Sequence, residues 1–410
     1  MAAKPWIKWT TICAVLAALI TVGAALRVTM ARDSRIDPNA AYLLLANSIR
    51  DNGRMVYEGE KFVPVSHLRK PPVLPYLIAA FPDSRSFLLA QAVFSALLAL
   101  PIFFLGRQWH DELAGLVAAS AWTFWTPAME LAGHLRPETV MYAFFLAGLL
   151  ALGISPQAAK ARRSVAAGIA FALAELTRTV FLPFVVMTIL AHLVWARVLP
   201  QRRQAVAGVV LLALGFGLPI AAYQVANWRH GFAWVYDRKG EVMLLGVERR
   251  HAEPPFDAGE PVTLEDALPG PLPDDWPSRN EGQRERYFVG LALREAMSHP
   301  GSFLLQSEDR LASFWFGAFG CEADALIPLC PSWWLTALAV VGLFVLRKNR
   351  GRAFWWSLFL VINFSLIAVF LNPKPIYREM VTPWLLTLAA VGVVGALQWI
   401  LRYKLRDIPD

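Results

Sequence analysis

The sequence is short of charge, of cysteine and of the motifs of soluble enzymes. Charged residues make up 17% of its 410 residues, whereas about a quarter is usual for a soluble domain. Three cysteines cannot build a disulfide framework; Cys321 and Cys330 flank a polar stretch and either pair in an oxidising compartment or stay free thiols. No GxxxxGK[ST] loop, GxSxG elbow or Ser-His-Asp order is present. These absences argue against a water-soluble enzyme and against direct coupling to ATP.

Apolar residues, in contrast, are abundant and segregated. They make up 56% of the chain, and the charges lie in short segments between long apolar runs. A helix needs about 20 such residues to cross the hydrocarbon of a bilayer. The sequence therefore predicts an all-α polytopic membrane protein of about ten transmembrane helices, at 9–26, 87–105, 113–131, 137–153, 164–176, 179–196, 204–226, 332–346, 353–371 and 380–400.

The basic residues predict the orientation of these spans. If the N-terminus is cytoplasmic, every basic cluster of the short loops and tails falls on the cytoplasmic side, as the positive-inside rule requires. A single helix over 164–196 would put Arg197 and its neighbours outside, so two helices are predicted there. Both termini are expected in the cytoplasm, at a cell inner or plasma membrane. The net charge of +8 is dispersed over loops, which argues against nucleic acid as a partner.

Two long segments then face outward, at 27–86 and 227–330. The second is crowded with proline and acid over 253–280, which predicts irregular structure there. The chain is expected to consist of an N-terminal membrane module at 1–226, the large extracytoplasmic loop, and C-terminal membrane helices at 331–410.

The first outer segment carries a candidate general base. Asp37 precedes a proline, which is the pattern of a helix N-cap and first helical position. Apolar residues at helical spacing from Tyr42 onward predict a short amphipathic helix over 38–50 at the membrane surface. Position alone favours a purely capping role for Asp37, although a capping carboxylate can also be catalytic.

Other charged residues are predicted at the same membrane face. Arg69 and Lys70 precede two prolines and either bind a phosphate at headgroup level or anchor the chain at the interface. Glu138 begins the fourth span, either as helix-end decoration or as an acidic partner of Asp37. Ionisable groups near membrane depth are functional candidates, though snorkelling to the interface is their commoner fate. Further candidates are Tyr42, Arg136, Arg178, Lys374, Tyr377 and Arg378.

In these segments the sequence resembles the GT-C glycosyltransferases, in particular the branch of protein O-mannosyltransferases and the lipid A aminoarabinose transferase. The similar segments run in order from about residue 9 to 400. They are DPNAAYLLLANSI, RKPPVLPYL, LRPETVMYAFFLAGLLAL, ELTRTVFLPFVV, NWRHGFAWVYDRKGEVMLLG, HPGSFLLQSEDRLASFWFG and PIYREMVTPWLLTLAAVG. Each motif alone is weak, and their order, sidedness and spacing carry the resemblance.

The resemblance implies an inverting transferase that moves a sugar from a polyprenyl-phosphate carrier to a hydroxyl of a lipid, glycan or protein on the outer face. It implies Asp37 as the carboxylate that deprotonates the acceptor and Glu138 as the second acidic position. Lys70 matches a basic residue expected to neutralise the lipid phosphate, and Tyr377 and Arg378 match a pair near the carrier. Many relatives carry two adjacent acids in the first loop, where this sequence has one.

Other classes of function stay open. A transporter or flippase of a lipid-linked sugar would need charged residues midway along several helices and broken spans, whereas most charges here lie at span ends. A polymerase or ligase of surface polysaccharide shares the large outer loop and the lipid substrate, but does not need the KPP segment. The two acids could hold Mg²⁺ or Mn²⁺, but acids without close spacing are poor evidence for a divalent cation, so no metal site is firmly predicted.

Overall fold

The computed structural model describes most of the chain. The described residues are 8–36, 41–53, 55, 70–153, 161–198, 202–229, 273, 275, 278–279, 281–316, 333–348, 352–370 and 380–406. Within these ranges the regular elements are helices, which confirms the predicted all-α fold. In chain order they are α1 (Trp9–Asp33), α2 (Ala41–Asn52), α3 (Val73–Ala79), α4 (Ser84–Leu97), α5 (Ala99–Trp109), α6 (Glu112–Thr123), α7 (Thr126–Ala132), α8 (Glu138–Leu152), α9 (Ala161–Thr177), α10 (Leu182–Val198), α11 (Arg202–Arg229), α13 (Glu281–Ser298), α14 (Pro300–Phe316), α15 (Trp333–Lys348), α16 (Arg352–Phe370) and α18 (Thr382–Arg406).

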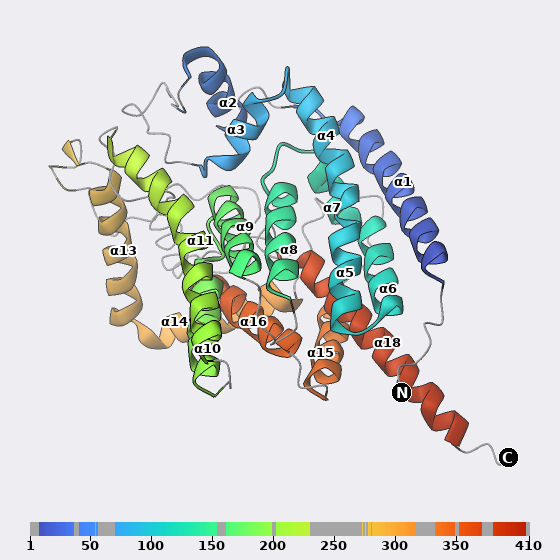
Figure 1. Cartoon of the computed structure of the whole chain (residues 1–410). Coiled ribbons are helices and arrows are strands. Elements are labelled where there is room, and N and C mark those ends of the chain that lie inside the picture. The colour runs from blue at the N-terminus through green and yellow to red at the C-terminus, as the bar shows by residue number, and fades with distance from the viewer. Residues whose placement is uncertain are drawn as a thin grey trace.

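The helices form a bundle, with α2 and α3 lying across one end and α18 running out to the opposite end (Figure 1). Within these described ranges, four stretches are long and apolar enough to cross a membrane, namely Trp9–Asp33, Ser84–Trp109, Arg202–Ala226 and Thr382–Arg402. Shorter apolar helices lie within α8, α10, α15 and α16. The chain is therefore a membrane protein, while the count of ten spans and their orientation stay predictions.

Two predicted spans are interrupted. The predicted helix 87–105 is divided at Leu98 into α4 and α5, because Pro101 has no N–H for the carbonyl of Leu97 and its ring crowds that carbonyl. The predicted helix 113–131 ends at Thr123 and resumes as α7, which has proline in its first turn. The split of 164–196 into two helices is confirmed, since α9 ends at Thr177 and α10 begins at Leu182.

The first helix continues to Asp33, beyond the predicted end at residue 26, and so contains Arg27. This side chain is fully buried. Its Nε donates to Ser95 Oγ at 3.0 Å, and its Nη1 and Nη2 donate to the carbonyls of Thr123 (3.0 Å) and Trp122 (2.8 Å). These carbonyls belong to the last turn of α6, where the regular series of helical hydrogen bonds ends. Arg27 therefore donates hydrogen bonds to the carbonyls at the end of α6 and so links α1 to α6.

Glycines allow the closest helix contacts. A Cβ at Gly168 of α9 would meet the backbone of Leu212 in α11, and one at Gly215 would meet the backbone of Val165. Small residues of this kind let membrane helices approach until their backbones touch. Four phenylalanines from α8, α9, α10 and the turn before it fill the adjoining core, with the rings of Phe145 and Phe181 stacked at 4.4 Å.

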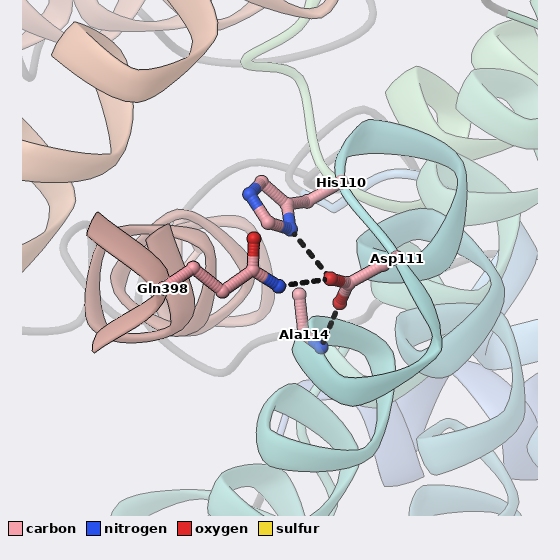
Figure 2. Close-up of polar contacts among 4 residues, drawn as sticks. All are labelled: His110, Asp111, Ala114 and Gln398. Carbon is pink, nitrogen blue, oxygen red and sulfur yellow. Dashed lines mark hydrogen bonds and ion pairs between the residues drawn. The ribbon is translucent and has the colours of Figure 1, made fainter. Parts of the chain in front are cut away.

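The turn between α5 and α6 is fastened to the last helix by Asp111 (Figure 2). Asp111 caps α6 by accepting the N–H of Ala114 at 2.9 Å, and it accepts Gln398 Nε2 of α18 at 2.7 Å. His110 Nδ1 lies 3.1 Å from the same carboxylate. Burial raises the pKa of the Asp111 carboxyl, but the contacts with His110, the Ala114 N–H and Gln398 outweigh it and lower the pKa to about 2.

Replacing Asp111 by alanine should lower the free energy of unfolding by about 0.5–2 kcal/mol at pH 7, the usual effect of losing an N-cap. The folded-state pKa of about 2 lies below the ordinary 3.8, so this stabilisation is complete above about pH 4 and is lost as pH falls toward 2. Thermal unfolding in detergent at pH 6 and pH 3 measures both effects. An Asp111→Ala variant with the wild type's full pH dependence would contradict the assignment.

Candidate functional site

Half of the ten predicted site residues can be located in the structure. Tyr42, Lys70, Arg136, Glu138 and Arg178 are described. The other five lie outside the described residues, and their predicted roles stay untested: Asp37, Arg69, Lys374, Tyr377 and Arg378. Cys321 and Cys330 also lie outside them.

Glu138 and Arg178 form a buried ion pair. Glu138 is the first residue of α8, and Arg178 directly follows α9, so the adjacent ends of two packed helices bring them together. Arg178 Nη1 lies 2.7 Å from Glu138 Oε1, and the side chains are 19% and 0% exposed. Within the described part of the chain no group donates a hydrogen bond to Glu138 Oε2. The pair thus holds one cation in place and leaves one carboxylate oxygen able to accept a hydrogen bond.

The turn that carries Arg178 is held by two further buried polar residues. Glu175 Oε2 accepts the N–H of Phe181 at 2.6 Å, and Asn363 Nδ2 of α16 donates to the carbonyl of Val180 at 3.2 Å. Nothing in the local sequence pointed to Asn363, which is far away along the chain. Both side chains restrain the backbone that follows Arg178, at Val180 and Phe181.

Lys70 and Tyr42 are brought together as well. The Lys70 ammonium lies 5.4 Å from the centre of the Tyr42 ring, within the range of a cation–π contact. Tyr42 belongs to α2 (Ala41–Asn52), which confirms a short helix in the described part of the predicted range 38–50, whereas residues 38–40 lie outside the described residues. Arg50 fastens α2 to the end of α3 by donating from Nη2 to the carbonyls of Ile78 (2.7 Å) and Phe81 (2.9 Å). No local pattern in the sequence indicated this contact of Arg50 with the end of α3.

One hydrophobic cluster joins these parts, and we call it the apolar platform. Tyr42 of α2 packs against it, and so does Val73, three residues after Lys70. Ile36 and Leu135 pack against it too, and they directly precede Asp37 and Arg136 in the sequence. The platform therefore gathers the chain segments that bear Tyr42, Lys70, Arg136 and Glu138, together with the segment that leads to Asp37. Its buried residues are Leu43, Ala46, Leu74, Ile78, Phe87 and Val140.

Arg136 is exposed in the segment between α7 and α8, and its backbone N–H bonds to the carbonyl of His134 at 2.8 Å. Among the described residues, no three His, Cys, Asp or Glu side chains lie close enough to hold a metal ion. The described residues thus place paired charges on or beside the apolar platform, where they can supply positive charge and hydrogen bonds.

Part of the chain matches a known protein family. Residues 69–223 match the family described as dolichyl-phosphate-mannose-protein mannosyltransferase, a range that contains Lys70, Arg136, Glu138 and Arg178. No curated protein matches the chain.

Solved structures of an oligosaccharyltransferase from Archaeoglobus fulgidus are similar in fold. The AglB complex with an inhibitory peptide and a dolichol-phosphate aligns with a TM-score of 0.54 at 16% identity, covering 99% of this chain and 53% of AglB. The apo form aligns with a TM-score of 0.57 at 14% identity, covering 98% and 52%. A complex of the same enzyme with zinc and sulfate is also similar, with a TM-score of 0.55. The chain spans about half the length of these proteins.

Proposed function

Since the chain has the GT-C fold of membrane glycosyltransferases and carries a mannosyltransferase-family domain, we propose that it is an inverting glycosyltransferase. It takes a sugar from a polyprenyl-phosphate carrier and passes it to a hydroxyl of a lipid, glycan or protein acceptor. The reaction takes place at the outer face of the cell membrane, with both termini in the cytoplasm. The observation that carries the proposal is the apolar platform, which gathers the segments bearing Lys70 and Glu138 and the one that leads to Asp37.

Asp37 is the general base of the proposed reaction. Its carboxylate takes the proton of the acceptor hydroxyl, and the oxygen forms a bond to the anomeric carbon of the donor sugar. The bond from that carbon to the phosphate oxygen breaks, and the lipid phosphate leaves with the electron pair. Attack from the face opposite the leaving phosphate inverts the configuration. Ile36, the residue before Asp37, packs on the platform, which supports this role.

Lys70 neutralises the departing phosphate, with Arg69, Tyr377 and Arg378 as its proposed partners. The contact with the Tyr42 ring restricts the flexible lysine side chain, so its charge is aimed before the donor binds. Charge that develops on the phosphate oxygen is thus met by a fixed cation rather than by reorganising water.

Glu138 acts on the reaction through Arg178. A buried carboxylate is tolerated when a cation pairs with it, and the partly exposed Arg178 is directed by that pair toward the outer end of α8. There its guanidinium places positive charge beside the proposed donor and acceptor. Arg136 and Lys374 are proposed to add positive charge near the same outer end of α8.

A flippase of lipid-linked sugar is the second candidate, and two observations favour it. The helices α4–α5 and α6–α7 are interrupted, and Arg27 is buried within α1. The donors of Arg27, however, bond to Ser95 and to the carbonyls at the α6 interruption, so the residue closes that interruption rather than lining a path. A polysaccharide polymerase or ligase is a third candidate, which shares the lipid substrate and the outer loop.

Replacing Lys70 by glutamine should raise the KM for the polyprenyl-phosphate donor and lower kcat/KM about tenfold to a hundredfold, because a charge-assisted contact to phosphate is lost. Lys70→Arg should keep most of the activity. Arg294→Gln removes a charge from the exposed face of α13 and serves as the matched control, with no expected change. Steady-state transfer in nanodiscs measures this, and an equal effect of the Lys70 and Arg294 variants would contradict the assignment.

A further inference from the structure

We propose that α4 sets the position of the two acid-bearing segments, and that Arg85 and Gln91 are positioning residues of the transfer site. The inference rests on the proposed function, because it concerns Asp37 and Glu138. The two polar side chains lie on one helix, and each bonds to backbone carbonyls of a different segment leading to one of the acids. Neither role was evident in the sequence.

Arg85 holds the segment that leads to Asp37. It donates from Nη1 to the carbonyl of Ala31 and from Nη2 to the carbonyl of Ser34 at 3.1 Å. These carbonyls end α1, where the helix leaves its last acceptors unpaired. The chain continues from Ser34 to Ile36, which packs on the apolar platform, and then to Asp37. Arg85 therefore fixes the direction in which the chain leaves α1.

Gln91 holds the segment that leads to Glu138. Its side chain is 3% exposed, and its Nε2 donates to the carbonyls of His134 at 2.6 Å and Ala132 at 3.3 Å. These residues form the turn between α7 and α8. A buried amide that donates to two carbonyls of one turn restrains that turn, because a shift of the turn would leave the buried amide donor without its acceptors. The position of the first residue of α8 follows from this turn.

The two segments also contact each other. A Cβ added at Gly133 would lie 2.8 Å from Ser34 Oγ, so the two segments are in contact at this point. The helix α4 therefore fastens both segments at their point of contact, six residues apart along its own axis. A shift of either segment would change the separation of the general base and the buried ion pair, and displacements of about 1 Å can lower a rate about a hundredfold.

The test compares two buried polar residues of α4. Gln91→Met keeps the volume of the side chain but removes the bonds to the turn, and it should lower kcat about tenfold to a hundredfold with the KM for the donor changed less than about twofold. Ser95→Ala is the matched control, since Ser95 bonds to Arg27 and to neither segment. It should lower the unfolding temperature while the folded protein keeps the wild-type kcat. Arg85→Gln should resemble Gln91→Met, and Arg85→Lys should recover part of the rate.

A second measurement is independent of transfer. Cysteines introduced at Ser34 and Gly133, in a chain with Cys13, Cys321 and Cys330 replaced, should form a disulfide readily, and Gln91→Met or Arg85→Gln should slow its formation at least several-fold. Ser95→Ala should leave it unchanged. If the wild type transfers no sugar but the variants show these cross-linking rates, the proposed function is overturned and the positioning role of Arg85 and Gln91 is kept. Equal kcat losses in Gln91→Met and Ser95→Ala, or unchanged cross-linking in Gln91→Met, would overturn the inference.

Discussion

Replacing Asp37 by asparagine should lower the rate of sugar transfer about 10²- to 10⁴-fold, the usual contribution of a general base. Asparagine keeps the shape of the side chain and its ability to cap a helix, but it cannot take the acceptor proton at neutral pH. The donor should still bind, because its phosphate is held by the basic residues. Transfer and donor binding measured on one preparation in nanodiscs separate the two effects.

Asp37→Ser distinguishes the two interpretations of this residue. Serine is as good an N-cap as aspartate but is no base, so the variant should be as inactive as Asp37→Asn while unfolding at the wild-type temperature. Asp33→Asn, in the exposed last residue of α1, is the matched control and should transfer normally. Normal transfer by both Asp37 variants would return the residue to a purely capping role.

Breaking the Glu138–Arg178 pair should have the largest effect on stability. Arg178→Gln leaves the Glu138 carboxylate fully buried without its cation, which is expected to lower the free energy of unfolding by about 3–5 kcal/mol. Glu138→Gln should cost less, because Arg178 is partly exposed and can be hydrated. Unfolding in detergent, followed by circular dichroism, measures both.

The double variant Glu138→Gln/Arg178→Gln should be more stable than the sum of the two single losses predicts, since no uncompensated charge remains buried. Additive losses within about 0.5 kcal/mol would show that the two side chains are not coupled. The double variant should still lose transfer, because Arg178 no longer supplies a directed cation.

The helices were largely predictable from the sequence, because an apolar run long enough for hydrocarbon has few alternatives to a helix. The division of 164–196 followed from the basic residue Arg197 and the positive-inside rule. The interruptions at Leu98 and after Thr123 were missed, although Pro101 and the proline at the start of α7 were available as signals. A hydropathy average over about 20 residues passes over such a break.

The contacts of the site were not predictable in the same way. Asp37, Lys70, Glu138 and Arg178 were proposed one by one from helix ends and from the family resemblance. The pairing of Glu138 with Arg178 and of Lys70 with Tyr42 depends on which helix ends meet in space, and no local pattern encodes that. Gln91 is a still clearer case, because a single glutamine in an apolar helix gives no indication of which carbonyls it will bind.

The central claim is that this protein breaks the bond between the sugar and its lipid phosphate, and one measurement tests it directly. Purified wild-type protein in proteoliposomes is supplied with polyprenyl-phosphate sugars radiolabelled in the sugar, together with lipid and glycan acceptors and no nucleotide. If the proposed function is right, label leaves the carrier and appears in an acceptor with inverted anomeric configuration. Label that crosses the bilayer while still attached to its carrier would contradict the proposed sugar transfer and establish a flippase.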